Sequence, residues 1–407
     1  MKKNYTRHFL FRLAAVFCGV IFSFTTFSQT NLGWIQKAGF PGPARHRAVG
    51  ASVNNRGYMG LGHINSIQDV LFDDWFEYDP GSDTWTQRAN FPGGPRMHAT
   101  AFVINNKIYV GTGRDVNSVL YNDFYCYNPV TNSWVQIASF PGAARRGAVS
   151  FVLNNLGYVG TGSYHSNFYK YDPTIDTWFP VTNLPGSGRI SAVAFAINGK
   201  GYLTTGDDGG PNADMWEYDP ALDTWTAKAN LPGLPRMEAC GFTMNGKGFV
   251  GTGDNYSSGT NYQDFWCYDP ATDSWMQVTD FAGAARRYMT TFVIGNRAYA
   301  GLGTSGINYA DLWEYGTISG VEENVADANP MEIYPNPVHD NTTLKFSTEV
   351  KNAELKLVDI SGKTVATYSE INGKEFHLER NEIPAGIYFV TLSENSKAIS
   401  ISKIIFE

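Results

Sequence analysis

A unit of about fifty residues recurs along most of the chain, and this repetition constrains the fold more than any other feature. The stretch FPGAARRGAVSFVLNNLGYVGTG (140–162) returns upstream as FPGGPRMHATAFVINNKIYVGTG and downstream as LPGLPRMEACGFTMNGKGFVGTG. A tryptophan closes each copy, at positions 34, 85, 134, 178, 225 and 275. An arginine accompanies it, at positions 45, 96, 145, 189, 236 and 286. The chain therefore contains six copies of one supersecondary unit.

The residue pattern within each copy predicts four short strands. The first strand (a) is apolar with small residues, and it ends in an Asn- or Gly-rich turn that suits a tight hairpin. The second (b) reads Tyr/Phe-x-Gly-x-Gly, the third (c) opens with Asp and aromatic residues, and the fourth (d) begins at the tryptophan. No helical period separates the copies, which excludes alternating strands and helices. Four strands per repeat are typical of a propeller blade.

The two ends of the repeat region complement each other. The last copy stops at DLWEYG without a tryptophan strand, whereas the chain begins with GWIQKAGF, a d strand with nothing before it. We expect Trp34 to supply the outer strand of the blade that ends near Tyr315. This pairing would close six blades into a ring and remove an exposed sheet edge.

The pattern resembles the kelch repeat, in which glycines after strand b precede an aromatic residue and a tryptophan at set distances. The usual Gly-Gly stands here as Gly-x-Gly, and the fourth blade keeps only Gly206. The fold class expected is all-β: a six-bladed kelch-type β-propeller closed by an N-terminal outer strand (29–318), followed by a small C-terminal β-sandwich. The WD40 signature is missing from the sequence.

Residues 1–28 are predicted to be a secretory signal peptide, because a basic start precedes a short apolar run (13–24) and small residues at the cleavage site. Removing it takes away four of the 31 Lys and Arg residues and none of the 38 Asp and Glu residues, so the net charge becomes −11. This balance argues against nucleic acid as a partner. No other apolar run reaches spanning length, so we expect no integral membrane segment in the mature protein.

The C-terminal region differs in composition from the repeats. An acidic linker (319–330) precedes alternating strand patterns in 331–407, where YPNPV (334–338), LKLVDISGKTV (355–365) and IPAGIYFVTL (383–392) occur in order. These motifs resemble the type A sorting domain of the type IX secretion pathway. The resemblance implies that the type IX secretion machinery is a partner of residues 331–407. It also implies a secreted or cell-surface location outside the outer membrane.

Strand direction predicts which face binds. The start of strand a, the end of strand b and the start of strand c share one face, where the b–c loops also vary. The repeated arginines fall on it and could bind an anionic ligand; these are Arg45, Arg96, Arg145, Arg189, Arg236 and Arg286. Alternatively, each arginine pairs with the Asp that opens strand c. Blade three has Asn167 at that place, so one arginine there, Arg145 or Arg189, should lack a carboxylate.

Two further positions change chemistry from blade to blade. The residue two after the arginine is Arg47, His98, Gly147, Ser191, Glu238 or Tyr288. The residue after Gly-x-Gly is His63, Arg114, Ser163, Asp207, Asp254 or Thr304. Residues that vary on a repeating scaffold are candidate specificity determinants. The ligand-binding candidates beside the six arginines are His63, Arg114, Tyr164, Asp207 and Asp254.

The sequence favours a binding module for an acidic glycan or an extracellular protein, with no cofactor and no metal. One alternative is catalytic: the chain resembles six-bladed kelch proteins that act as sialic-acid mutarotases, and the resemblance makes Glu238 and His98 the candidate acid–base pair. A kelch copper oxidase is disfavoured by the few histidines. A further alternative is a non-catalytic adhesion or structural component. Cys126, Cys240 and Cys267 are expected to be buried thiols.

Overall fold

The computed structural model describes residues 32–65, 69–256, 258–317, 331–359, 363–394 and 397–407. The chain divides into two compact units, within Met1–Ile318 and Ser319–Glu407. The predicted signal peptide (1–28) and linker (319–330) lie outside the described residues, so both stay predictions. The described residues are all-β, and no helix among them has the length and hydropathy to cross a membrane.

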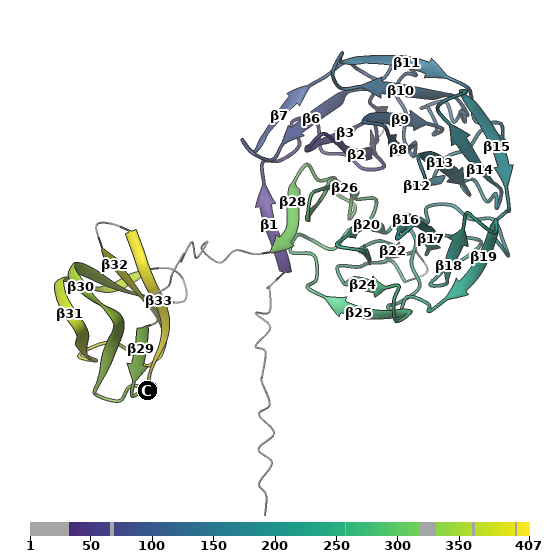
Figure 1. Cartoon of the computed structure of the whole chain (residues 1–407). Helices are drawn as coiled ribbons and strands as arrows, with labels where there is room; N and C mark the ends of the chain where they lie inside the picture. The colour runs from purple at the N-terminus through teal and green to yellow at the C-terminus, as the bar shows by residue number, and fades with distance from the viewer. Residues whose placement is uncertain (1–31, 66–68, 257, 318–330, 360–362, 395–396) are drawn as a thin grey trace, which may run out of the picture. The chain divides into compact units, whose positions relative to one another are not determined.

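The first unit is a ring of six four-stranded antiparallel sheets, the blades, around a common axis (Figure 1). Blade one runs outward through β2 (Val49–Val53), β3 (Arg56–Gly60), β6 (Trp75–Asp79) and β7 (Thr84–Gln87). Blade two has β8 (Thr100–Ile104), β9 (Lys107–Gly111), β10 (Phe124–Asn128) and β11 (Ser133–Ile137). Blade three has β12 (Val149–Leu153), β13 (Leu156–Gly160), β14 (Phe168–Asp172) and β15 (Thr177–Val181).

Blades four to six continue the ring. Blade four has β16 (Val193–Ile197), β17 (Lys200–Thr204), β18 (Met215–Asp219) and β19 (Thr224–Lys228). Blade five has β20 (Cys240–Met244), β21 (Lys247–Gly251), β24 (Phe265–Asp269) and β25 (Ser274–Val278). Blade six has β26 (Thr290–Ile294), β27 (Arg297–Gly301), β28 (Leu312–Thr317) and, as its outer strand, β1 (Leu32–Lys37). Two small hairpins lie in b–c loops: β4 (His63–Ile64) with β5 (Val70–Leu71), and β22 (Asp254–Asn255) with β23 (Thr260–Asn261).

Strand β1 closes the ring as the sequence predicts. It pairs antiparallel with β28, and Trp34 lies opposite Tyr315. The Trp34 ring packs against Phe265, Phe281 and Tyr315, with ring centroids 4.9–5.2 Å apart. The last blade thereby gains the outer strand that its own repeat lacks, and its sheet edge is covered.

Aromatic side chains join neighbouring blades, and glycines in strand b make room for them. A Cβ added at Gly57 would lie 2.2 Å from the Phe292 ring of the preceding blade, and one at Gly157 would lie 2.4 Å from Phe102. Only glycine permits that approach. The d-strand tryptophans also connect neighbouring blades at their outer edges. Trp85 and Trp134 donate from Nε1 to the carbonyl oxygens of Ala38 and Ala89, at 2.9 Å each.

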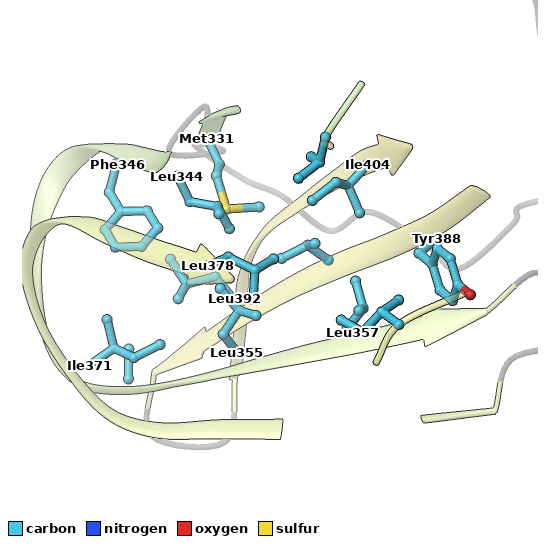
Figure 2. Close-up of a cluster of buried hydrophobic side chains, with 14 of the residues drawn as sticks. Met331, Leu344, Phe346, Leu355, Leu357, Ile371, Leu378, Tyr388, Leu392 and Ile404 are labelled. Atoms are coloured by element: carbon cyan, nitrogen blue, oxygen red, sulfur yellow. The ribbon is translucent and has the colours of Figure 1, made fainter. Parts of the chain in front are cut away.

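The second unit is built from β29 (Met331–Tyr334), β30 (Asn341–Asp359), β31 (Thr364–Glu379), β32 (Gly386–Glu394) and β33 (Lys397–Phe406). Bulges interrupt the long pairing of β30 with β31. The first part of β30 also pairs with β29, and its last part pairs with β32, which in turn pairs with β33. Figure 2 shows the apolar core that they enclose, which includes Leu355, Leu357, Leu378, Leu392 and Ile404. Asn336 of the YPNPV motif pairs through its amide with the backbone of Lys403 and Ile405, at 2.9 Å each.

Candidate functional site at the channel mouth

Six residues from six blades line one cavity of about 160 Å³ at the end of the channel. They occupy the position two after the repeated arginine: Arg47, His98, Gly147, Ser191, Glu238 and Tyr288. Alanines next to them, such as Ala148, Ala192 and Ala239, line both this cavity and a second one lined by the inner strands. Residues that differ from blade to blade therefore converge on one cavity at the axis of the ring.

The backbone at this position is left-handed in every blade. The φ angles lie between 55° and 62°, values that non-glycine residues adopt at a cost. The conformation turns the peptide groups along the ring, where they bond from blade to blade. His98 N donates to Arg47 O at 3.1 Å and Tyr288 N to Glu238 O at 2.8 Å, with similar bonds through Gly147, Ser191 and Glu238. This belt of hydrogen bonds holds the varied side chains at one level.

The six repeated arginines are buried, with exposed fractions of 0–2 %. Five donate from both Nη atoms to the Asp that opens strand c, at 2.5–3.2 Å; the pairs are Arg45–Asp74, Arg96–Asp123, Arg189–Asp214, Arg236–Asp264 and Arg286–Asp311. Each also donates to a strand-b carbonyl, such as Leu61 O for Arg45. In these five blades the arginine pairs with the Asp of strand c, as the alternative predicts, and joins the b–c and d–a loops of its own blade. The binding of a ligand by the repeated arginines stays a prediction.

Blade three is the exception that the sequence predicts. Arg145 donates from Nη1 to Asn167 Oδ1 at 2.8 Å, and no carboxylate among the described residues pairs with it. Burial lowers the pKa of Arg145 to about 10, so the guanidinium is still charged at neutral pH. Arg189 has its own partner in Asp214, at 2.6 and 2.8 Å.

An acidic pair, Glu238 and Asp254, lies on one side of the cavity. Both are largely buried, with 9 % and 2 % exposed. Arg287 Nη1 donates to Asp254 Oδ2 at 2.6 Å, and Arg287 Nε lies 3.2 Å from Glu238 Oε2. Burial, and then the neighbouring Asp254 carboxylate, raise the pKa of Glu238 to about 8. Glu238 is therefore mostly protonated at neutral pH, which gives the cavity a carboxylic acid that can donate a proton.

Arg47 lies against two histidines and a tyrosine instead of a carboxylate. Its Nη1 is 3.1 Å from His46 Nε2 and 3.2 Å from His63 Nε2, and its Nη2 donates to Tyr288 Oη at 2.6 Å. A guanidinium only donates hydrogen bonds, so both ring nitrogens that face it must accept. Burial, and then the charge of Arg47, lower the pKa of His46 to about 3 and that of His63 to about 4. Both histidines are neutral at physiological pH.

His98 and two further arginines complete this basic side. Both ring nitrogens of His98 are buried without a hydrogen-bond partner in the described part of the chain. Burial, followed by the charges of Arg47 and Arg146, lowers the pKa of His98 well below its usual value. Arg146 and Arg47 likewise add to the burial that lowers the pKa of Arg114. Of Arg47, Arg114, Arg146 and Arg287, only Arg287 forms an ion pair with a carboxylate among the described residues.

The other ligand-binding candidates are not among the residues that line this cavity; they are His63, Arg114, Tyr164, Asp207 and Asp254. Tyr164 is 55 % exposed and donates from its hydroxyl to Asp207 Oδ2 at 2.8 Å. His63, Asp207 and Asp254 are buried, and each pairs through its backbone with the residue directly after a repeated arginine. Three other tyrosines of the b–c loops pack on repeated arginines: the ring centroids of Tyr121, Tyr262 and Tyr309 lie 4.2, 4.6 and 3.6 Å from the guanidiniums of Arg96, Arg236 and Arg286.

The sequence reasoning missed the residue directly after each repeated arginine. His46, Arg146 and Arg287 stand there, and all three act on the cavity electrostatically or by contact. Met97, Ile190 and Met237 occupy the same place in the other blades. This position alternates between charged or polar and apolar residues in an otherwise repeating sequence, and that variation could have marked it as part of the site.

Among the described residues, the cysteines form no disulfide, and no side chains are grouped as a metal site would require. Cys126, Cys240 and Cys267 are free, and they belong to strands in blades two and five. Burial raises the pKa of Cys240 to about 12 and that of Cys267 to about 11, so both stay protonated. No cluster of three or more His, Cys, Asp or Glu side chains suitable for a metal ion is found there.

Comparisons with known proteins agree with this architecture. Residues 95–141 match the Kelch motif, and residues 332–407 match the family described as "Secretion system C-terminal sorting domain". A solved structure described as "Structure of YjhT" is similar with a TM-score of 0.55 and 22% identity, over 67% of this chain and 95% of that chain. At that identity the likeness shows the fold alone. None of the curated proteins matches the chain.

The fold and these matches define a class: a kelch-repeat β-propeller that carries a secretion sorting domain. The chain is a six-bladed kelch propeller whose C-terminal unit is a type IX sorting domain. The sorting domain directs export by that pathway to the cell surface or beyond, so its secretion machinery handles this chain.

Proposed function

We propose that the channel mouth binds a small acidic ligand, with a carboxylate-bearing glycan as the class that fits best. The observation that carries the proposal is the group of three arginines, Arg47, Arg114 and Arg146, without a carboxylate partner among the described residues. Arginines elsewhere in the blades pair with acids, as in Arg45–Asp74 and Arg88–Glu77. Positive charge left uncompensated beside a cavity favours an anion.

The polar groups around the cavity suit a hydroxylated ligand as well as an anionic one. His98 has two ring nitrogens without partners in the described part of the chain, and Glu238 holds a proton at neutral pH. Tyr288 also lines the cavity, and the centroid of its aromatic ring lies 5.0 Å from that of the His98 ring. Sugars combine these needs, because they present hydroxyls to polar groups and an apolar face to rings.

A glycan array probed with the full chain tests this proposal. We expect binding to glycans that end in a carboxylate and loss of binding when the same carboxylate is methyl-esterified. Arg146→Gln should weaken the binding by about tenfold, the equivalent of ~1.4 kcal/mol. Arg56→Gln is the matched control, because Arg56 lies at an a–b turn and pairs with Asp79. Equal binding of esterified glycans, or an unchanged affinity of Arg146→Gln, would refute the proposal.

A second candidate function, exchange between sugar anomers, is favoured by the protonation states of Glu238 and His98. The raised pKa of Glu238 keeps an acid, and the lowered pKa of His98 keeps a neutral base, in one cavity. In such a reaction the base takes the anomeric hydroxyl proton while the acid protonates the ring oxygen. The ring C–O bond then breaks to give a carbonyl, and closure on its other face gives the second anomer.

Exchange spectroscopy by NMR on a free acidic sugar separates catalysis from binding alone. Catalysis predicts anomer exchange faster than in buffer, and a loss of that acceleration in Glu238→Gln while the sugar still binds. Exchange at the buffer rate in the presence of the wild-type chain would leave the channel mouth as a binding site without turnover.

A further inference from the structure

Blade three lacks one acceptor that the other blades have around their buried arginine. In blade two, Arg96 Nη1 and Nη2 donate to the two carboxylate oxygens of Asp123, at 2.6 and 3.2 Å. In blade three, Arg145 Nη1 donates to Asn167 Oδ1 and to Thr161 O, at 2.8 Å each, and Nε donates to Ala143 O at 2.9 Å. Arg145 Nη2 is buried and finds no acceptor among the described residues.

The chemistry of the side chain at position 167 explains the difference. A carboxylate has two acceptor oxygens, whereas an amide has one oxygen and an NH2 group that only donates. Whichever way the Asn167 amide is turned, one of its two ends presents donors to the guanidinium. A position that holds an acceptor oxygen in five blades therefore holds a donor in blade three.

In blades four, five and six, the Asp oxygen that accepts from Arg Nη2 also accepts a hydrogen bond from a tryptophan. Trp216, Trp266 and Trp313 each donate from Nε1 to the second carboxylate oxygen of their blade's Asp, at 2.7–2.8 Å. Tyr169 has this place in strand c of blade three, as Tyr125 has in blade two. In blade three, Arg145 Nη2 therefore meets an amide instead of the second carboxylate oxygen that other blades place beside this strand-c residue.

No ion pair in the described part of the chain compensates the charge of Arg145. The centroid of the Phe140 ring lies 4.6 Å from the Arg145 guanidinium, and His165 of the b–c loop is close enough for that charge to act on its ring. Burial, and then the charge of Arg145, lower the pKa of His165, so that ring is neutral at physiological pH. Asn167 and Tyr169 are only half-buried, which leaves a route from the surface. A buried guanidinium without a counter-charge is costly, and an anion that reaches it would stabilise the fold.

We propose that blade three binds one small monovalent anion of halide size between Arg145 Nη2, the Asn167 amide and Tyr169. Bound beside these donors, the anion would supply the negative charge that the second carboxylate oxygen of Asp supplies in the other blades. This site is independent of the channel mouth, because neither Arg145 nor Asn167 lines that cavity. It makes the propeller's stability depend on chloride, the halide most available outside cells.

Thermal melting of the full chain in chloride against gluconate, at equal ionic strength, tests the site. We expect the melting temperature of the wild type to rise with chloride. Asn167→Asp supplies the missing oxygen covalently, so this variant should melt higher in gluconate and lose its response to chloride. Asp123→Asn is the matched control, because it copies the blade-three arrangement beside Tyr125 and should add a second chloride response.

Bromide soaked into crystals of the wild type gives an independent readout by anomalous scattering. A bromide peak beside Arg145 that is absent in Asn167→Asp supports the proposal. An identical chloride response in wild type and Asn167→Asp, or bromide peaks only at other places, would overturn it. Neither result bears on the binding of acidic glycans, which Arg146→Gln tests separately.

Discussion

Two positions that lie two residues apart in every repeat behave in opposite ways. The first is always arginine, is buried, and pairs with strand c of its own blade. The second is a different residue in each blade, has a left-handed backbone, and lines the channel-mouth cavity. In this propeller, therefore, the residue that is the same in every blade holds the blade together, and the residue that differs sets the chemistry of the cavity.

The largest expected effect comes from breaking the constant position. Asp74→Ala leaves the buried Arg45 without its carboxylate, so the free energy of unfolding should fall by about 3 to 5 kcal/mol. Chemical denaturation measures the loss. Asn167→Ala is the comparison in blade three, where removing one neutral acceptor should cost only about 1 kcal/mol. Equal losses in the two variants would contradict the role assigned to the ion pairs.

The next effect concerns pH and the varied position. Because Glu238 has a pKa of about 8 in the folded chain and about 4.5 when unfolded, the folded state binds more protons between these values. Stability should therefore fall as pH rises from about 4.5 to about 8, by a few kcal/mol in total. Glu238→Gln removes this contribution, so the variant should gain stability relative to the wild type across that window. Parallel stability–pH curves would count against the buried, protonated Glu238.

A smaller effect separates binding from folding. Arg146→Gln should reduce affinity for a carboxylate-bearing glycan by about tenfold while changing the free energy of unfolding by less than about 0.5 kcal/mol. Calorimetry of binding and of unfolding on the same variant gives both values. A loss of stability as large as that of Asp74→Ala would place Arg146 in the scaffold instead of the site.

The smallest effect tests the left-handed backbone. Ser191 has φ of 56°, and Gly147 has the same place in blade three with φ of 62°. Ser191→Gly relieves the strain but frees the unfolded chain, so we expect a net change within about 1 kcal/mol. Ser191→Val, with a branched side chain at the same φ, should be clearly destabilised. A Ser191→Val variant as stable as the wild type would argue against strain in the belt.

The sequence was enough for the ring and for the constant contacts. The missing strand after Tyr315 and the spare one at Trp34 predicted closure, and Asn167 predicted that one of the six repeated arginines lacks a carboxylate partner. These inferences work because strand order and charge type do not depend on fine geometry. The composition of the cavity was harder to predict. His46 and Arg287 escaped notice because the left-handed turn after them, invisible in the sequence, decides which neighbouring side chains reach the channel.

The pairing of β1 with β28 has a consequence for how the propeller can be rewired. Leu32 lies opposite Thr317, so the first and last residues of the ring are one strand spacing apart, about 5 Å. The two ends of the propeller could therefore be joined by a short linker, and we expect the fold not to depend on where the termini lie. A circular permutant opened at the Asn154–Asn155 turn should form the same disc. Its export signal could then be attached to a different blade without rebuilding the binding face.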